Sequence, residues 1–324
     1  MARRIVSLLP AATEMVCALG RADDLVGITH ECDYPAEIHD RPVVVRNAIP
    51  LEGLTPREID ESVAARLGRG ESIYAVDEAL LRSLEPDLII TQDLCQVCAP
   101  SGNEVSRVVN TLPRSPEILS FTPKSLADVY TNIEALGIAT GAIEPARRLV
   151  AAGRGVTERI TAITSTASHR PRVFCMEWFD PVYCSGHWIP EMVELAGGRD
   201  RLARKWADSA RVSWEAVCEW APEILVLMPC GLSLDRVAAQ AANLSERDGW
   251  SRIPAVRDQR VYAVDANSYF ARPGPRLVDG TELLAHLFHP ELVPWLGPAG
   301  AFKRLDGAGS PKTAPSPVAA TALS

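Results

Sequence analysis

The sequence predicts an α/β protein of two lobes, each built on a sheet rich in parallel strands, with one long helix joining them. Three observations predict this fold: a duplicated helix–strand segment, a second pair of matched segments, and a helical stretch between the two halves. Strands that alternate with helices favour parallel sheets. A chain of 324 residues, 47% of them hydrophobic, can bury a core in each lobe.

The clearest repeat pairs residues 76–91, VDEALLRSLEPDLIIT, with residues 212–227, VSWEAVCEWAPEILVL, without a gap. Each copy begins a short helix at an N-cap candidate, Asp77 or Ser213, whose side-chain oxygen can accept from a free backbone N–H. The helix stops before a proline. A continuous apolar run then follows in both copies, as expected for a strand buried on both faces.

A second pair of segments precedes these copies. Residues 3–20 and residues 171–198 each place a strand after arginine, then a loop, then Glu-Met-Val opening a helix that ends in glycine. Glu14 and Glu191 are the matching glutamates. The two halves of the chain therefore share a plan but differ in what separates the matched segments.

The halves are joined by a helical stretch from Ser125 to about Ser165. Its second part, residues 142–163, is predicted to be one long helix even though interior glycines each cost about 1 kcal/mol relative to alanine. The predicted organisation is listed from the N-terminus: lobe 1 over about 4–122, the connecting helix over about 125–165, lobe 2 over about 170–290, and a disordered tail rich in Ala, Pro, Gly and Ser over 297–324.

The formal charge of −8 argues against nucleic acid as a partner, because phosphate binding needs a concentrated basic surface. No apolar run approaches the roughly 20 residues that cross a bilayer, so a membrane-spanning protein is not predicted.

The N-terminus has two early arginines and an apolar run, but Glu14 interrupts that run and no small-x-small cleavage site follows. This stretch is expected to form a strand over Arg4 to Leu9 and a helix over Thr13 to Leu19. The sequence as written therefore predicts a cytoplasmic protein, with an extracytoplasmic one as the alternative.

Four stretches carry a resemblance to a known family: IVSLLPAATEMVCALG near the N-terminus, DYP at 33–35, LEPDLIIT at 84–91 and RVYAVDANSYFARPGPRLV at 260–278. Their order resembles the iron-siderophore and vitamin B12 type of periplasmic binding protein from about Arg4 to Pro290. LEPDLIITQDLCQVCA together with EWFDPVYCSGHWIPEMVELAGG is most similar to the cobalamin-binding subgroup.

This resemblance implies that one ligand binds in a cleft between the lobes, at loops that leave the carboxyl ends of strands. It implies a cobalamin-like corrinoid or related chelate as ligand, no required cofactor, and an ABC transporter permease as a possible partner. The role implied is uptake or intracellular corrinoid handling. The resemblance is incomplete in the segment NSYFARPGPR, residues 267–276. Relatives have acidic residues there at the positions of Ser268 and Ala271 in this chain. Candidate ligand-contacting residues are Pro10, Ala11, Thr13, Tyr34, Gln92, Asp93, Trp178, His187, Trp188, Cys230, Tyr269, Phe270 and Arg272.

Different side chains in this set suggest different contacts. An arginine such as Arg272 can reach the phosphate or amide periphery of a corrinoid. Trp188 can stack on a flat macrocycle, and a neutral His187 imidazole can approach the metal as an axial ligand. The alternative is that the tryptophan packs in the lobe core and the histidine bonds a backbone carbonyl.

Cys95 and Cys98 form a Cys-x-x-Cys loop directly after a predicted strand. In a reducing compartment eight cysteines favour thiolate ligands and buried thiols over disulfides. With His30 and Cys32 of another strand-exit loop, the pair can form a Cys₃His zinc site or anchor an iron–sulfur cluster. The other interpretation is that these thiols are small, half-buried loop residues at the edge of the cleft.

No motif of a nucleophile elbow, P-loop, dinucleotide-binding loop or zincin is present, so an enzyme is not predicted. The competing hypothesis is a cytoplasmic metal-binding protein or metalloenzyme that uses the His30/Cys32/Cys95/Cys98 cluster. The family resemblance also implies one glutamate per lobe that docks onto a transporter, and Glu78 and Glu215 fall near those points.

Overall fold

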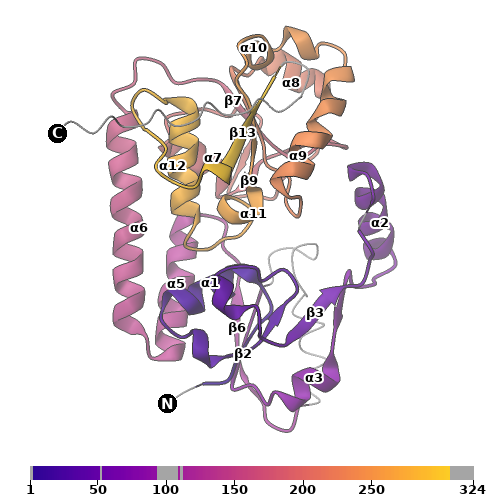
Figure 1. The fold of residues 1–324 in the computed structure, drawn as a ribbon, viewed down its shortest axis with the longest axis vertical. Helices are drawn as coiled ribbons and strands as arrows, with labels where there is room; N and C mark the ends of the chain where they lie inside the picture. Colours follow the sequence, from indigo (N-terminus) through magenta and orange to yellow (C-terminus); the bar gives the residue numbers. More distant parts are fainter. Residues whose placement is uncertain (1–2, 52, 93–108, 110–111, 307–324) are drawn as a thin grey trace, which may run out of the picture.

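The computed structural model describes residues 3–51, 53–92, 109 and 112–306. They form two α/β lobes, lobe 1 within residues 3–122 and lobe 2 within residues 170–306, and two helices join the lobes along one side (Figure 1). The predicted fold class is confirmed. Among these residues no helix combines the length and the apolar character that crossing a membrane requires.

Lobe 1 has a six-stranded sheet in the order β4-β3-β2-β1-β5-β6, with every neighbouring pair parallel except β3 and β4. Its strands are β1 (Ile5–Ser7), β2 (Leu25–Thr29), β3 (Val43–Asn47), β4 (Tyr74–Val76), β5 (Leu88–Gln92) and β6 (Glu117–Phe121). The helices described in lobe 1 are α1 (Pro10–Ala18), α2 (Pro56–Gly68) and α3 (Glu78–Ser83), with short 3₁₀ turns at Ala22–Asp24 and Ala36–Ile38.

Lobe 2 has a five-stranded sheet in the order β13-β12-β11-β7-β8, in which β7, β11 and β12 run parallel. Its strands are β7 (Val173–Trp178), β8 (Tyr183–Cys184), β11 (Ile224–Leu227), β12 (Val261–Val264) and β13 (Phe302–Leu305), with a separate pair β9 (Gly186–His187) and β10 (Arg204–Lys205). Its helices are α7 (Ile189–Leu195), α8 (Trp214–Trp220), α9 (Leu234–Ala241), α10 (Pro254–Arg257), α11 (Ala266–Tyr269) and α12 (Leu277–Phe288).

The duplicated segments occupy matching places in the two sheets. The Asp77 side chain accepts from the N–H of Leu80 at the start of α3, and the Ser213 side chain accepts from the N–H of Ala216 at the start of α8. Each helix leads into a buried strand that pairs in parallel with the first strand of its lobe, β5 with β1 and β11 with β7. Both predicted N-caps are thus confirmed.

The N-terminal boundaries differ from the prediction. The first strand ends at Ser7, and α1 begins at Pro10 rather than Thr13. Proline suits the first turn of a helix because its missing N–H would have no partner there. Thr13 consequently lies inside the helix, fully buried, and is not its cap.

The connection between the lobes is an antiparallel helix pair, so the long helix predicted over 142–163 is confirmed as the second helix, while the whole stretch 125–165 is not one helix. It consists of α5 (Leu126–Thr140) and α6 (Ile143–Thr164), which lie side by side in Figure 1. Gly141 separates them with φ of 70°, a left-handed conformation that glycine adopts without a Cβ penalty. Gly137 allows the two helices to approach closely, because a Cβ there would lie 2.5 Å from the Cβ of Ala146.

The predicted disordered tail also needs correction in its first part. Phe302–Leu305 forms β13, an antiparallel edge strand on β12, so the folded part of lobe 2 extends beyond residue 290. Residues 307–324 lie outside the described residues. One cluster of buried side chains runs from lobe 1 through α5 and α6 into lobe 2, with Ile5, Ile133 and Leu284 among its members, and each lobe has a further cluster on the other face of its sheet.

Candidate ligand site between the lobes

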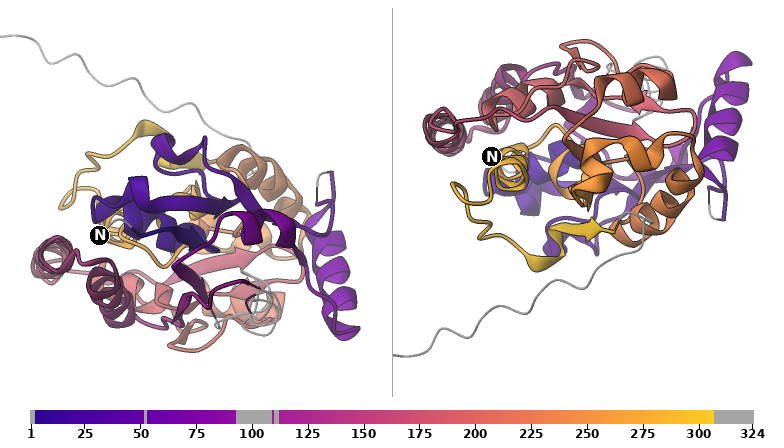
Figure 2. Two further views of the ribbon diagram at one scale, coloured as in Figure 1. Left: turned by 90° about the horizontal axis from the view of Figure 1, so that it is seen from below. Right: turned by 90° about the horizontal axis from the view of Figure 1, so that it is seen from above.

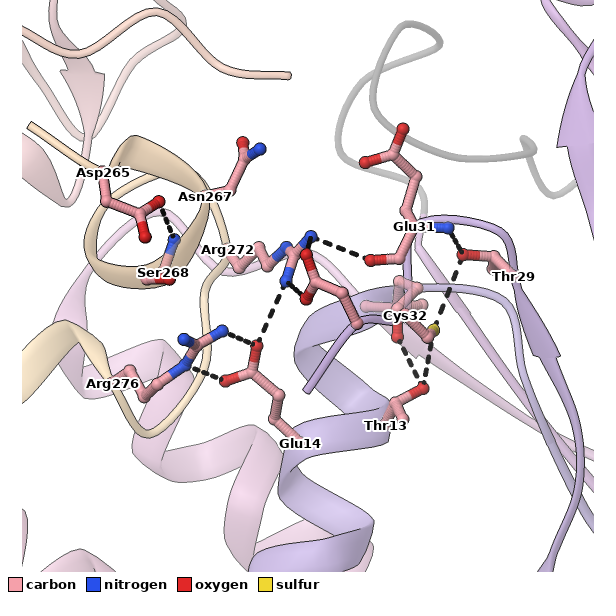
Figure 3. Close-up of polar contacts among 12 residues, drawn as sticks. Thr13, Glu14, Thr29, Glu31, Cys32, Asp265, Asn267, Ser268, Arg272 and Arg276 are labelled. Atoms are coloured by element: carbon pink, nitrogen blue, oxygen red, sulfur yellow. Dashed lines mark hydrogen bonds and ion pairs between the residues drawn. The ribbon is translucent and has the colours of Figure 1, made fainter. Parts of the chain in front are cut away.

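The candidate site lies where the parallel strands of both lobes end. In lobe 1, β1 leads into α1, and β2 leads into the loop that contains Cys32 and Tyr34. In lobe 2, β11 leads toward Cys230 and β12 leads into α11 and the segment that contains Arg272. Figure 3 shows that the segment after α11 meets α1 and the loop after β2, although it is more than 200 residues from both in sequence.

A cluster of charges joins the lobes at this place. Glu14 of α1 accepts from Arg276, with Oε2 2.8 Å from Nε and Oε1 2.6 Å from Nη2 (Figure 3). Arg272 Nη1 lies 3.7 Å from the same carboxylate. Glu14 is buried, so its charge is stable only because guanidinium groups compensate it. We call Glu14, Asp33, Arg272 and Arg276 the interlobe charge cluster.

The Arg272 guanidinium is paired with groups of lobe 1. It forms a two-point ion pair with Asp33, and its Nη2 donates to the Glu31 carbonyl at 2.8 Å. Burial by itself would raise the pKa of Asp33, but the hydrogen bond and charge of Arg272 outweigh burial and lower it. Arg272 can therefore contact a ligand only if its ion pair with Asp33 breaks.

Tyr34 extends the cluster toward solvent. Its ring is 48% exposed and lies under the Arg276 guanidinium, with 4.2 Å from Cζ to the ring centroid. This cation–π contact holds a large aromatic side chain at the surface of lobe 1. Tyr34 is the one large exposed aromatic among the predicted ligand residues that the structure describes.

A cavity of about 600 Å³ adjoins the cluster on the side of the connecting helices. Glu14, Tyr34 and Arg276 line one end, and mostly apolar side chains of α1, α5 and α6 line the rest. Of the predicted ligand residues that the structure describes, Tyr34 alone lines this cavity, and most of its wall comes from α1, α5, α6 and residues 274–279. We therefore place the candidate ligand site at the strand ends and not in this cavity.

The lobe 2 residues of the candidate set divide into buried and accessible groups. Trp188 is buried and its indole N–H donates to the Phe270 carbonyl at 2.8 Å; Phe270 and Tyr269 are buried as well. His187 is half-buried, has φ of 52°, and its Nε2 lies 3.1 Å from Asp208 Oδ1. Burial lowers the pKa of His187, which favours the neutral imidazole.

The remaining candidates differ in exposure. Trp178 is half-buried and its indole N–H donates to the Pro56 carbonyl at 3.1 Å. Gln92 is buried, and its Nε2 has no hydrogen-bond partner among the described residues. Cys230 is exposed and Pro10 is half-buried, whereas Ala11 and Thr13 are buried. Asp93 lies outside the described residues.

The proposed metal cluster is only half described, since Cys95 and Cys98 lie outside the described residues. Cys32 Sγ is 3.0 Å from Thr13 Oγ1 and 3.5 Å from Thr29 Oγ1, and burial raises the pKa of its thiol (Figure 3). His30 Nδ1 lies 3.1 Å from the Val45 carbonyl. Within the described ranges no three His, Cys, Asp or Glu side chains are grouped to hold a metal ion.

Sequence reasoning paired Glu14 with Glu191 but did not find what they bind. Glu191 Oε2 accepts from the N–H of Leu126, the first residue of α5, at 3.1 Å. The two matched glutamates thus both act at lobe boundaries, Glu14 on the far lobe and Glu191 on the connecting helices. The only sequence signal was their match, because their arginine and backbone partners are remote in sequence.

Two further carboxyls of lobe 2, those of Glu177 and Asp200, do not belong to the predicted site residues. Glu177 of β7 accepts from the Ser209 hydroxyl and from the Gly186 N–H, and burial raises its pKa to about 7. Asp200 accepts from the Cys175 N–H at 3.1 Å, and burial raises its pKa to about 7 as well. Glu177 thus binds the backbone of Gly186, the residue before His187, and helps to position that candidate side chain.

The predicted docking glutamates lie in equivalent places. Glu78 is in the first turn of α3 and Glu215 is in the first turn of α8, so the repeat relates them. Glu215 is exposed and Glu78 is half-buried. Their role in docking stays a prediction.

The sequence pattern of the periplasmic binding protein family matches residues 5–268. The chain belongs to this family. It is 28% identical over 297 residues to a Bacillus subtilis protein named as an uncharacterized ABC transporter substrate-binding lipoprotein, YvrC, covering 89% of this chain and 81% of that one. It is 25% identical over 280 residues to the vitamin B12-binding protein of Vibrio parahaemolyticus, covering 85% and 86%.

The crystal structure of a periplasmic heme-binding protein from Pseudomonas aeruginosa has the same fold, with a TM-score of 0.70 at 19% identity over 97% of this chain and 99% of that one. At such identity the likeness concerns the fold alone. Family members are substrate-binding proteins, which confirms the prediction that the chain is not an enzyme. The metalloenzyme hypothesis finds no support.

The predicted cytoplasmic location is wrong. The family is periplasmic and the relative in B. subtilis is a lipoprotein, so the extracytoplasmic alternative is the correct one. The prediction depended on the lack of a targeting pattern in the N-terminal run, but this run forms β1 and α1 of lobe 1, so its pattern carries no information on location. The premise of a reducing compartment for the cysteines falls with it.

Proposed function

We propose that this protein binds a cobalamin-like corrinoid in the cleft between its lobes, as the substrate-binding component of an ABC-type uptake system. The observation that carries the proposal is the similarity over 85% of the chain to a protein named for vitamin B12 binding. A second relative, from Halobacterium salinarum, is named a cobalamin-binding protein and is 28% identical over 295 residues.

The geometry supports a large ligand with both apolar and polar parts. The strand ends present two aromatic side chains that are not buried: Tyr34 lies against Arg276 of the interlobe charge cluster, and Trp178 lies against the start of α2. Aromatic faces suit a macrocycle, and charged groups suit its amide and phosphate periphery. His187 supplies an imidazole whose lowered pKa favours the neutral form, the state that can bind a metal.

The test is calorimetric titration of the purified protein with hydroxocobalamin, with hemin and a ferric siderophore titrated separately. We expect one-to-one binding of hydroxocobalamin that is tighter than binding of the other two chelates. Preferential binding of hemin would replace the corrinoid with haem as ligand. No heat with any of the three would contradict the proposal.

A variant pair tests the histidine. His187→Ala is expected to weaken hydroxocobalamin binding several-fold and, if the imidazole reaches cobalt, to change the visible spectrum of the bound ligand. The matched control is His169→Ala, which removes an exposed histidine before β7, at the end of lobe 2 remote from the strand exits. Identical spectra and affinities for wild type and His187→Ala would exclude a role in binding.

A further inference from the structure

Helix α2 has few buried residues for its length of 13 residues. In α2, which the structure describes in full, the buried residues are Pro56 and Ile59. Figure 1 shows α2 reaching from lobe 1 alongside lobe 2, and both views of Figure 2 place it at the edge opposite α5 and α6. A helix with so little core contact in its own lobe needs partners elsewhere.

Two ion pairs hold α2 against lobe 2. Arg57 donates to Asp180 through two bonds, Nε to Oδ2 at 3.0 Å and Nη2 to Oδ1 at 3.1 Å. Arg211 Nη2 of lobe 2 donates to Asp60 Oδ2 at 2.8 Å. Arg57 and Asp60 are three residues apart, so both point from one face of α2.

Two side chains of lobe 2 also bind the backbone at the start of α2. Trp178 donates its indole N–H to the Pro56 carbonyl at 3.1 Å, and Arg236 donates to the Leu54 carbonyl at 3.3 Å. Trp178, one of the candidate ligand-contacting residues, is therefore part of the same contact. A capping box between Thr55 and Glu58 keeps this end of the helix ordered.

The ends of this segment are suited to rotation. Gly53 has φ of 80° and Gly70 has φ of 67°, and nothing lies within 4 Å of the Cβ position of either. Left-handed glycines in open space next to a helix can change φ and ψ at low steric cost. The arginines of the anchoring ion pairs are exposed and the aspartates are half-buried, and ion pairs open to solvent on one side are individually weak. The segment can therefore release without disturbing either core.

We propose that residues 54–68 are a strap that holds the lobes together on the side of the cleft opposite α5 and α6, and that this strap releases when ligand enters or leaves. The interlobe charge cluster closes the side next to the connecting helices, so the strap side is the route for exchange. The part concerning ligand rests on the proposed function. The part concerning release does not.

The test variant is Arg57→Ala combined with Asp60→Asn, which removes both ion pairs of the strap. The matched control is Arg147→Ala combined with Lys303→Ala, which removes two exposed ion pairs, one within α6 and one between β13 and α9. Neither control pair crosses between the lobes. Hydrogen exchange of residues 54–60 and 178–182 is measured without ligand, and stopped-flow absorbance follows hydroxocobalamin binding.

We expect the strap variant to exchange these amides about tenfold faster than the control and to bind and release hydroxocobalamin about tenfold faster. Equal ligand rates in the strap variant and the control would overturn the proposal. If the wild-type protein binds no hydroxocobalamin, the proposed function fails, and hydrogen exchange then tests the release of the strap by itself. Faster exchange in the strap variant then supports the strap, and equal exchange overturns it.

Discussion

The carboxyl of Glu177 shows how burial at one residue can make lobe 2 sensitive to pH. Burial raises its pKa to about 7, above the usual carboxyl range, so the folded protein holds a proton that the unfolded chain releases at lower pH. The native state then binds more protons between about pH 5 and pH 7. By linkage its contribution to stability is present at low pH and is lost as pH rises through 7.

Glu177→Gln should remove this dependence. The amide oxygen can still accept from Gly186, and no charge develops at high pH. We expect the variant to gain stability relative to wild type as pH rises from 5 to 8, by less than about 1.4 kcal/mol per pH unit, the limit for one proton. Urea denaturation at several pH values measures the difference. Exposed Glu246→Gln is the control, and parallel curves for Glu177→Gln and wild type would refute the assignment.

At the level of elements, α5 and α6 offer a comparison between two interior glycines. A Cβ on Gly137 would lie 2.5 Å from the Cβ of Ala146, whereas a Cβ on Gly155 would meet nothing within 4 Å. Helix propensity alone predicts that alanine stabilises both positions by up to about 1 kcal/mol. We expect Gly155→Ala to do so and Gly137→Ala to cost about 1–3 kcal/mol through overpacking. Thermal denaturation of the two variants tests this, and stabilisation by Gly137→Ala would contradict the close helix approach.

The same elements show which features could be predicted from the sequence. Asp77 and Ser213 were predictable as caps because a cap depends on a few neighbouring residues, and the apolar runs after them identified central strands. The start of the long helix after Gly141 was predictable, but the close packing of α5 on α6 was not, because it depends on contacts between the two helices. Phe302–Leu305 became a strand through pairing with β12, which no local pattern indicates.

For the whole molecule, the sequence predicted which loops meet between the lobes better than it predicted the partners of their side chains. The strand-exit loops and the family were predictable from ordered motifs, and the structure brings those loops together. Trp188 and Phe270 nevertheless bond to each other in the core, and Arg272 is paired across the lobes. Such partners are fixed by the tertiary arrangement, so residue type and motif alone could not assign them.

The interlobe charge cluster makes a prediction for the stability of the entire fold. The buried core runs through both lobes and the connecting helices, so the lobes are expected to unfold together. Glu14→Gln keeps the size of the side chain but leaves Arg276 without a compensating charge in a mostly buried place. Breaking a buried pair typically costs 3–5 kcal/mol, and we expect about 3 kcal/mol here because Asp33 still pairs with Arg272.

Scanning calorimetry combined with urea denaturation measures this cost. Glu71→Gln is the matched control, since it breaks an ion pair of Arg69 that is exposed and lies within lobe 1. We expect the control to change the free energy of unfolding by less than about 1 kcal/mol, as exposed pairs do. Equal losses in the two variants would mean that Glu14 contributes no more than a surface charge. A large loss for Glu14→Gln alone would show that one carboxylate, contributed by the first helix of the chain, helps to hold lobe 1 against lobe 2.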